Sequence, residues 1–219
     1  MKDINCWEQK FESCVYSDRL LGKLLKLNEK AKNKINIIEV KKAIYYAKKY
    51  HGEQKRDSGE PYYSHPLEVA FITANFLFRT DLIVTAILHD VLEDTTMSKE
   101  AIEIIFGSKV ANQVEDLTRV KENRKISSEE MVESLWQQKK FEVLFIKQLD
   151  RLHNMRTIGS KTPAKMKKIA EETGVTFLIL SAYFEQLDIE NELYSLCSNI
   201  TDPIVSEYYN QYLQDYFYY

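Results

Sequence analysis

Residues 80–95 read TDLIVTAILHDVLEDT, an apolar run that ends in a cluster of titratable side chains. An apolar run of this kind is typical of a buried helix. If the helix continued, its four-residue spacing would place Glu93 on the face of His89. The same spacing would place Asp94 on the face of Asp90. A solvated last turn is one interpretation, but carboxylates at that end of a helix repel its exposed carbonyl groups. The stretch breaks a local rule, and such breaks often mark functional sites.

Helical periodicity extends in both directions from this stretch. Apolar residues recur at helical spacing after residue 37, and Ser127 with Glu130 has the spacing of a capping box. No alternation typical of hairpin strands stands out, and residues 121–125 are predicted to form a charged loop. The expected helices cover residues 37–50, 65–78, 81–92, 98–106, 110–117, 127–136 and 141–158, with a last helix that begins at 163. The sequence therefore predicts an all-α protein.

The composition supports a helical globular chain. Of 219 residues only 6 are Gly and 4 are Pro, which excludes collagen-like and linker-like chains and disfavours a turn-rich all-β fold. Hydrophobic residues make up 44%, enough for a core, so global disorder is not expected. The formal net charge of −3 argues against sequence-independent nucleic-acid binding, which needs a large basic surface.

Several cellular settings are also disfavoured by the sequence. The polar N-terminus lacks the apolar stretch of a signal peptide, and the longest apolar runs are too short to span a bilayer. The three cysteines form no C-x-x-C pair, so neither a disulfide framework nor a zinc knuckle is indicated. We therefore expect a reduced, cytoplasmic protein with no membrane or nucleic-acid partner, although the composition still allows a local basic pocket for a small polyanion.

Two imidazoles and two carboxylates occur in the order H…HD…D. They are His65, His89, Asp90 and Asp150. This donor set suits a divalent ion of intermediate hardness such as manganese, iron or zinc, whereas calcium prefers oxygen ligands only. Because Asp150 lies 60 residues after Asp90, the site would have to form by tertiary packing.

Two further stretches carry polar groups in a suggestive arrangement. Asp150, Asn154 and Thr157 follow helical spacing and form one polar stripe, which predicts either a functional face or a solvated one. Residues 51–66 form a turn-rich loop that holds two of the four histidines and four of the ten Gly and Pro residues. Loops of this composition often hold binding groups on a rigid scaffold.

Three stretches together carry a family resemblance. They read QKRDSGEPYYSHPLEVA at residues 54–70, AILHDVLEDT at 86–95 and DRLHNMRT at 150–157. The chain resembles the hydrolase domain of the RelA/SpoT homologue family, an HD-domain phosphohydrolase that degrades the stringent-response alarmone guanosine 3′,5′-bis(diphosphate), ppGpp. The resemblance covers about residues 36–175 and implies an all-helical HD bundle, with a reaction that releases pyrophosphate from ppGpp or pppGpp and leaves GDP or GTP.

The resemblance also implies roles for individual residues. A Mn²⁺ ion would be held by His65, His89, Asp90 and Asp150. Glu93 and Asp94 would orient the reacting water and assist proton transfer. The nucleotide would be contacted by Arg56, Ser58, Lys121, Asn154 and Thr157.

The chain departs from the family pattern at Asp57, where a basic residue is usual after the arginine. A carboxylate there weakens the positive potential for phosphate, so a different phosphorylated nucleotide, an adenine alarmone or NADPH, is an alternative substrate. A lapsed hydrolase that binds an alarmone without turnover is a third hypothesis. The synthetase domain of long members has no room here, so a hydrolase-only protein is expected.

The expected organisation has three parts. Residues 1–34 are expected to form a helical lead-in, residues 35–175 the HD-type hydrolase domain, and residues 176–219 a helical extension with a tyrosine-rich tail. The aromatic face of this tail predicts packing on the body of the protein or contact with a second copy in a homodimer.

Overall fold

The computed structural model describes residues 6–121 and 124–201, together with residues 211 and 214. The chain divides into two compact units, Met1–Ile146 and Lys147–Tyr219. Its elements are α1 (Trp7–Lys10), α2 (Val15–Lys30), α3 (Ile37–His51), α4 (Ser64–Thr73), α5 (Thr80–Leu88), α6 (Val91–Asp94), α7 (Lys99–Phe106), α8 (Ser108–Leu117), β1 (Val120–Lys121), β2 (Arg124–Lys125), α9 (Ser128–Gln137), α10 (Phe141–Arg156), η1 (Ile158–Ser160), α11 (Pro163–Glu172), η2 (Thr173–Phe177), α12 (Leu178–Tyr183) and α13 (Leu187–Thr201). The all-α prediction is confirmed.

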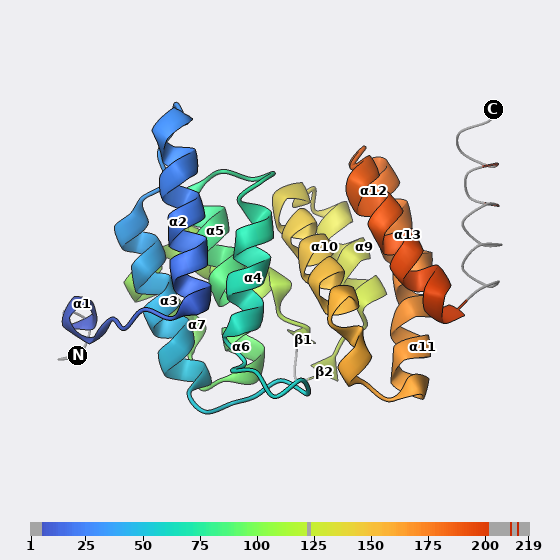
Figure 1. Ribbon diagram of the computed structural model, residues 1–219, viewed down its shortest axis with the longest axis horizontal. Coiled ribbons are helices and arrows are strands. Elements are labelled where there is room, and N and C mark those ends of the chain that lie inside the picture. Colours follow the sequence, from blue (N-terminus) through green and yellow to red (C-terminus); the bar gives the residue numbers. More distant parts are fainter. Residues whose placement is uncertain (1–5, 122–123, 202–210, 212–213, 215–219) are drawn as a thin grey trace. The chain divides into compact units, whose positions relative to one another are not determined.

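Helix α5 is the centre of the first unit (Figure 1). It contacts α3, α4 and α8, while α2 packs against α4. The apolar residues of α5 from Leu82 to Leu88 are buried, which explains why the run is apolar on every side. The packing of α5 on its neighbours holds its C-terminal end in place, and with it His89 and Asp90, which follow directly.

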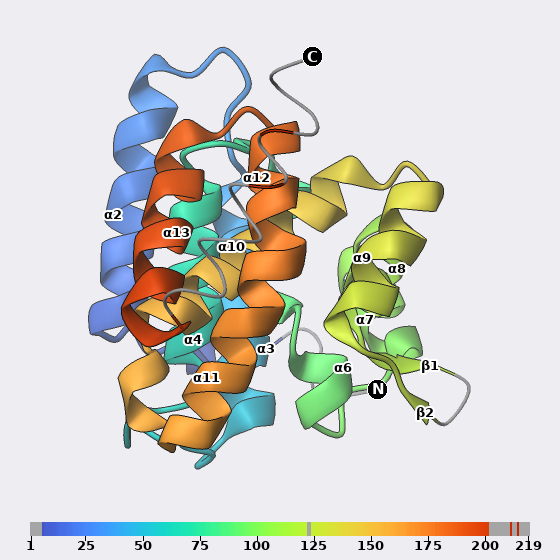
Figure 2. The same cartoon turned by 90° about the vertical axis from the view of Figure 1, so that its right-hand side faces the viewer.

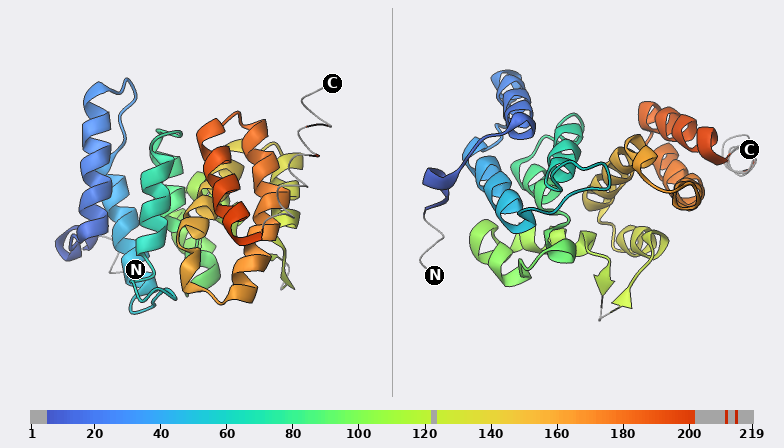
Figure 3. Two further views of the ribbon diagram at one scale, coloured as in Figure 1. Left: turned by 45° about the vertical axis from the view of Figure 1, so that its right-hand side comes forward. Right: turned by 60° about the horizontal axis from the view of Figure 1, so that its bottom comes forward.

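The second unit contains α11, η2, α12 and α13 (Figures 2 and 3). Helix α13 contacts both α11 and α12. Within this unit the Gln148 side chain is hydrogen-bonded to Ser181, and the guanidinium of Arg151 lies 4.6 Å from the ring centroid of Phe177. Phe177 is fully buried, so this cation–π contact forms away from water.

Two helix starts follow the sequence signals closely. The Ser98 hydroxyl accepts a hydrogen bond from the Ala101 amide at the start of α7. Ser127 and Glu130 form a reciprocal capping box at the start of α9, as their spacing predicts. These caps satisfy amide groups that the helix itself leaves without a partner.

The structure corrects three sequence predictions about element boundaries. The helix expected over 81–92 is divided into α5 and α6, and the helix expected over 65–78 ends at Thr73. At this division the ring of His89 bonds the Ala86 carbonyl, and α6 begins a new helix after Asp90. The predicted charged loop contains β1 and β2, which pair in antiparallel register.

The predictions about the C-terminal tail and about the boundaries of the three parts are not tested by the structure. The tyrosine-rich tail, residues 208–219, lies outside the described residues except for two isolated positions, so homodimer contact stays a prediction. The boundaries proposed at residues 35 and 175 also stay predictions. Among the described residues, no helix combines the length and apolar character needed to cross a membrane.

Candidate functional site

Two buried histidines lie next to each other in the first unit. His65 is the second residue of α4, and His89 caps the C-terminus of α5. The two helices pack together, which brings the imidazole centroids to 5.1 Å. Their exposed fractions are only 4% and 2%. Buried imidazoles at this distance need partners that a packed apolar core does not provide.

The proton on His89 can be assigned from its surroundings. Nδ1 lies 2.8 Å from the Ala86 carbonyl oxygen, which can only accept, so Nδ1 carries the hydrogen and Nε2 presents its lone pair. A histidine that ligates a metal commonly has this arrangement, with the other ring nitrogen bonded to a backbone carbonyl.

Asp90 faces both histidines. Its Oδ1 lies 3.1 Å from Nε2 of His89, and its Oδ2 lies 3.7 Å from Nε2 of His65. A carboxylate oxygen and a bare imidazole nitrogen are both acceptors, so they repel at this distance unless a proton or a cation lies between them. The donor set of two imidazoles and a carboxylate therefore fits a divalent metal ion of intermediate hardness.

Asp94 belongs to the same cluster. The hydroxyl of Tyr62 donates to Oδ2 of Asp94 at 2.6 Å and lies 3.4 Å from Oδ2 of Asp90. Burial raises the pKa of Asp94 above its ordinary value, and the charges of Asp90 and Glu93 raise it further against the lowering effect of the Tyr62 hydrogen bond. A carboxyl group with a raised pKa is a stronger base in its ionised form, which suits it to accept a proton.

Glu93 lies in a different electrostatic environment. It accepts a hydrogen bond from the Arg119 amide at 3.1 Å, and Lys125 of β2 lies 2.7 Å from its Oε1. Burial alone would raise the pKa of Glu93, but the Lys125 hydrogen bond and the Arg119 charge together lower it below its ordinary value. The pKa values of the two neighbouring carboxyl groups, Asp94 and Glu93, are thus shifted in opposite directions, a pattern that often separates acid and base roles.

The loop before α4 presents Arg56 and Ser58. The Arg56 amide donates to the Glu60 carbonyl, and the Gly59 amide donates to the Arg56 carbonyl. Gly59 has a φ of +88°, a conformation that residues with a Cβ rarely adopt. The turn therefore fixes the backbone around the two predicted substrate contacts, whose roles remain predictions.

Asp150 and Asn154 lie together on α10 in the second unit. The Asn154 amide donates to Oδ1 of Asp150 at 2.7 Å, and Nζ of Lys147 donates to Oδ2, also at 2.7 Å. Asp150 is buried, as a metal ligand of the predicted kind would be. The hydroxyl of Thr157 donates to the His153 carbonyl at 3.1 Å. The side chain of Lys121 lies outside the described part of the chain.

Three residues that support this cluster are not among those predicted from the sequence. Tyr62 bonds the predicted acids, and Arg119 and Lys125 bind Glu93. Tyr62 lies within residues 54–70, one of the stretches that carry the family resemblance, so the sequence could have indicated that it belongs to the site. Arg119 and Lys125 reach Glu93 through the β1–β2 hairpin, which the sequence pattern did not predict.

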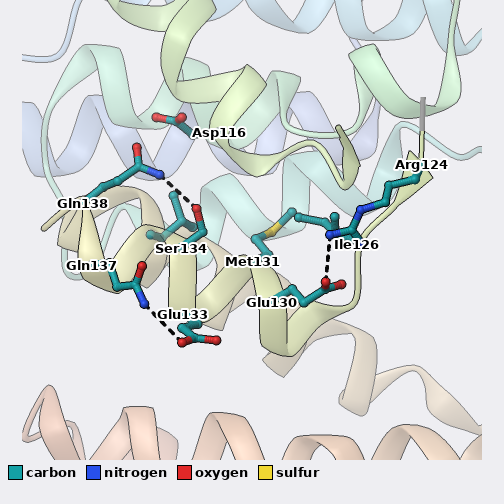
Figure 4. Close-up of a pocket in the computed structure, with 10 residues that line it drawn as sticks. Asp116, Arg124, Ile126, Glu130, Met131, Glu133, Ser134, Gln137 and Gln138 are labelled. Carbon is teal, nitrogen blue, oxygen red and sulfur yellow. Dashed lines mark hydrogen bonds and ion pairs between the residues drawn. The ribbon is translucent and has the colours of Figure 1, made fainter. Parts of the chain in front are cut away.

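A separate cavity of about 560 Å³ lies beside α9 (Figure 4). Its acidic lining residues are Asp116, Glu130 and Glu133, and its one basic lining residue, Arg124, is paired with Glu130. A polyphosphate would be repelled by this excess of negative charge. The cavity contains none of the predicted metal ligands, so it is not part of the candidate site.

The HD domain family model matches residues 43–183. The chain is 36% identical over 181 residues to "GTP pyrophosphokinase rsh" of Brucella ovis, covering 80% of this chain and 24% of that protein. It is 32% identical over 179 residues to a "Guanosine-3′,5′-bis(diphosphate) 3′-pyrophosphohydrolase" of Spiroplasma citri, covering 79% and 24%. It is 38% identical over 146 residues to a probable enzyme of the same name from Synechocystis, covering 64% and 19%.

This chain spans about a quarter or less of the length of these relatives. Their names agree with the predicted relationship to the hydrolase domains of RelA/SpoT homologues, which is thereby confirmed. The family match includes α4, α5 and the clustered His65, His89 and Asp90. The chain belongs to the HD domain family.

Proposed function

We propose that this chain is a metal-dependent hydrolase of ppGpp and pppGpp that removes pyrophosphate from the 3′ position and leaves GDP or GTP. The observation that carries the proposal is the apposition of Nε2 of His89 and Oδ1 of Asp90 at 3.1 Å. Two acceptors held this way are suited to share a cation. The names of the relatives from Spiroplasma citri and Synechocystis supply the substrate class.

The proposed ligands are His65, His89, Asp90 and Asp150, with Mn²⁺ as the favoured ion. Asp150 is a buried side chain able to ligate a metal, and its Oδ1 is oriented by Asn154. Partners of this kind orient ligands in metal sites and tune their basicity. A bound divalent ion would polarise phosphoryl oxygens and lower the pKa of a coordinated water.

Asp94 is the residue we assign to proton transfer. Tyr62 occupies its Oδ2, and no described donor contacts its Oδ1, which leaves Oδ1 as the atom that can take a proton from the attacking water. The raised pKa of Asp94 suits this exchange. Glu93, whose pKa is lowered, is held by Arg119 and Lys125 and is assigned to orienting the reacting water.

Two side chains of the loop before α4 are assigned to substrate binding. Arg56 and Ser58 are placed on the fixed turn before α4, where a guanidinium can contact guanine or phosphate. We assign the other nucleotide contacts to Lys121, Asn154 and Thr157. These assignments follow the family resemblance and are tested by substitution rather than by the geometry described above.

Asp57 favours a second candidate class of substrate. Its side chain is exposed beside Arg56 and brings a negative charge to the turn that would approach the nucleotide. A substrate with fewer phosphate charges than ppGpp, such as NADPH, would be repelled less strongly by this carboxylate. An adenine alarmone would test the base preference independently of charge.

The experiment is a substrate panel with purified full-length protein. ppGpp, an adenine alarmone and NADPH are each incubated with Mn²⁺ or with EDTA, and nucleotide products and pyrophosphate are separated and quantified. We expect pyrophosphate and GDP from ppGpp only with Mn²⁺, and loss of turnover in Asp94→Asn and Asp150→Asn. Glu103→Gln, an exposed substitution on α7, serves as the matched control.

Two outcomes would overturn the proposal. Faster release of phosphate or pyrophosphate from NADPH or the adenine alarmone would assign the site to another nucleotide. Binding of ppGpp without any product, with or without Mn²⁺, would identify a lapsed hydrolase instead.

A further inference from the structure

His51 is a buried histidine that the proposed reaction does not use. It is the last residue of α3 and is 1% exposed. Its Nδ1 lies 2.8 Å from Oε1 of Gln54, three residues further along the chain. A buried imidazole at a helix end requires an explanation, because burial of an unpaired polar group is unfavourable.

Gln54 determines the tautomer of His51. The Nε2 group of Gln54 donates to the backbone carbonyl of Asp94 at 2.8 Å, and a carbonyl can only accept. The other end of the amide, Oε1, is therefore the atom that meets His51, and it too can only accept. Nδ1 of His51 must carry the hydrogen, which leaves Nε2 with its lone pair.

The His51 ring also supports Tyr62. The two rings stack with centroids 4.7 Å apart and an interplanar angle of 22°. Tyr62 donates to Oδ2 of Asp94, while Gln54 donates to the backbone carbonyl of the same residue. His51 therefore touches both groups that hold Asp94, one through Nδ1 and the other through the face of its ring.

The remaining nitrogen of His51 distinguishes this arrangement from simple packing. Nε2 is buried and has no hydrogen-bond partner among the residues that the structure describes. An unsatisfied buried acceptor destabilises the folded state, so an apolar ring would pack at this position at least as well. Burial also lowers the pKa of His51, which keeps the ring neutral.

We propose that His51 is a positioning residue for Asp94, which it holds through the Nδ1–H bond to Gln54 and through the stack on Tyr62. The inference rests on the proposed function, because it gives Asp94 its orientation toward the attacking water. It predicts that loss of the Nδ1 donor impairs turnover without loosening the fold.

The first test reads the tautomer directly and does not depend on activity. Nitrogen-15 NMR of the full chain, with His51 assigned by comparison with His51→Phe, is recorded in EDTA at neutral pH. The Nδ1–H neutral tautomer is expected. An Nε2–H tautomer or an imidazolium would overturn the proposal, even if the protein hydrolyses ppGpp.

The second test separates positioning from packing by matched variants. His51→Phe keeps a ring on Tyr62 but lacks the donor, whereas the side-chain amide of His51→Asn supplies a donor near the Nδ1 position. We expect the kcat for ppGpp to fall about 10- to 100-fold in His51→Phe, with KM and Mn²⁺ affinity little changed, and to recover in large part in His51→Asn. Gln54→Leu combined with His51→Phe is expected to be no slower than the slower of the two single variants.

Two kinetic results would contradict the proposal. Equal kcat values for His51→Phe and the unsubstituted protein would show that the donor is not needed. Additive losses in the double variant would show that His51 does not act through Gln54. Absence of ppGpp turnover in the unsubstituted protein would instead contradict the proposed function, and the NMR result would still decide the tautomer.

Discussion

Asp90→Asn is the substitution whose effect can be worked out most fully from the structure. In the metal-free protein, Oδ1 of Asp90 faces the lone pair of His89 Nε2 at 3.1 Å. An amide nitrogen at that position can donate to the lone pair, and the amide oxygen can still accept from Tyr62, which lies 3.4 Å from Oδ2. Replacing a repulsive pair by a hydrogen bond is expected to stabilise the metal-free protein by about 1 kcal/mol.

The same substitution weakens the proposed metal site. At a Mn²⁺ concentration of about 100 times Kd, binding adds about 2.7 kcal/mol to the stability of the unsubstituted protein. If loss of the anionic ligand raises Kd about 100-fold, the variant gains only about 0.4 kcal/mol at that concentration. The order of stability should therefore reverse, with the variant more stable in EDTA and the unsubstituted protein more stable in Mn²⁺.

Thermal unfolding with and without Mn²⁺ measures this reversal. For a chain of this length, 1 kcal/mol corresponds to a shift of about 2–4 °C in Tm, which is readily resolved. Glu103→Gln serves as the control and should follow the unsubstituted protein in both conditions. A variant that is less stable in EDTA, yet gains as much from Mn²⁺ as the unsubstituted protein, would refute the assignment of Asp90 as a ligand.

Three further predictions concern the surroundings of the site. Lys125→Met should raise the pKa of Glu93 toward its ordinary value of 4.5. Lys125 lowers the pKa of Glu93 in the folded state, so the unsubstituted protein should be more stable than the variant by the full amount above the ordinary pKa. This difference in stability should disappear as pH falls through the lowered folded-state pKa. Urea unfolding at several pH values measures the difference, and a difference that does not change with pH would contradict the prediction. Gly59→Ala places a Cβ at a φ of +88° and should destabilise the protein by about 1–2 kcal/mol and reduce ppGpp turnover, whereas unchanged urea midpoints would show that the turn relaxes. Ser98→Ala removes the cap of α7 and should lower the free energy of unfolding by about 1 kcal/mol without affecting turnover; loss of turnover would link α7 to the site.

The fold could be predicted largely from local signals. The apolar run before His89, the capping box at Ser127 and the scarcity of Gly and Pro all indicate helices, and helices formed there. The break between α5 and α6, where the His89 ring bonds the Ala86 carbonyl, could not be predicted. Periodicity describes which face is buried, but it carries no information about such a bond.

The candidate site could be predicted in part. The order of His65, His89 and Asp90 indicated a metal site, and these residues do cluster in the first unit. The expected helical placement of Glu93 beside His89 did not indicate its actual partners. Those partners, Arg119 and Lys125, belong to a later segment of the chain and meet Glu93 through tertiary contacts, Arg119 from 26 residues further along.

The proposed function requires that a divalent metal bound by this chain drives hydrolysis of ppGpp. The most direct test removes metal with EDTA, titrates Mn²⁺ back, and measures bound metal and pyrophosphate release on the same samples. We expect release from ppGpp to be absent without metal and to rise in proportion to bound Mn²⁺ until the site is filled. Release that is equally fast in metal-free protein, or bound Mn²⁺ without any release, would contradict it.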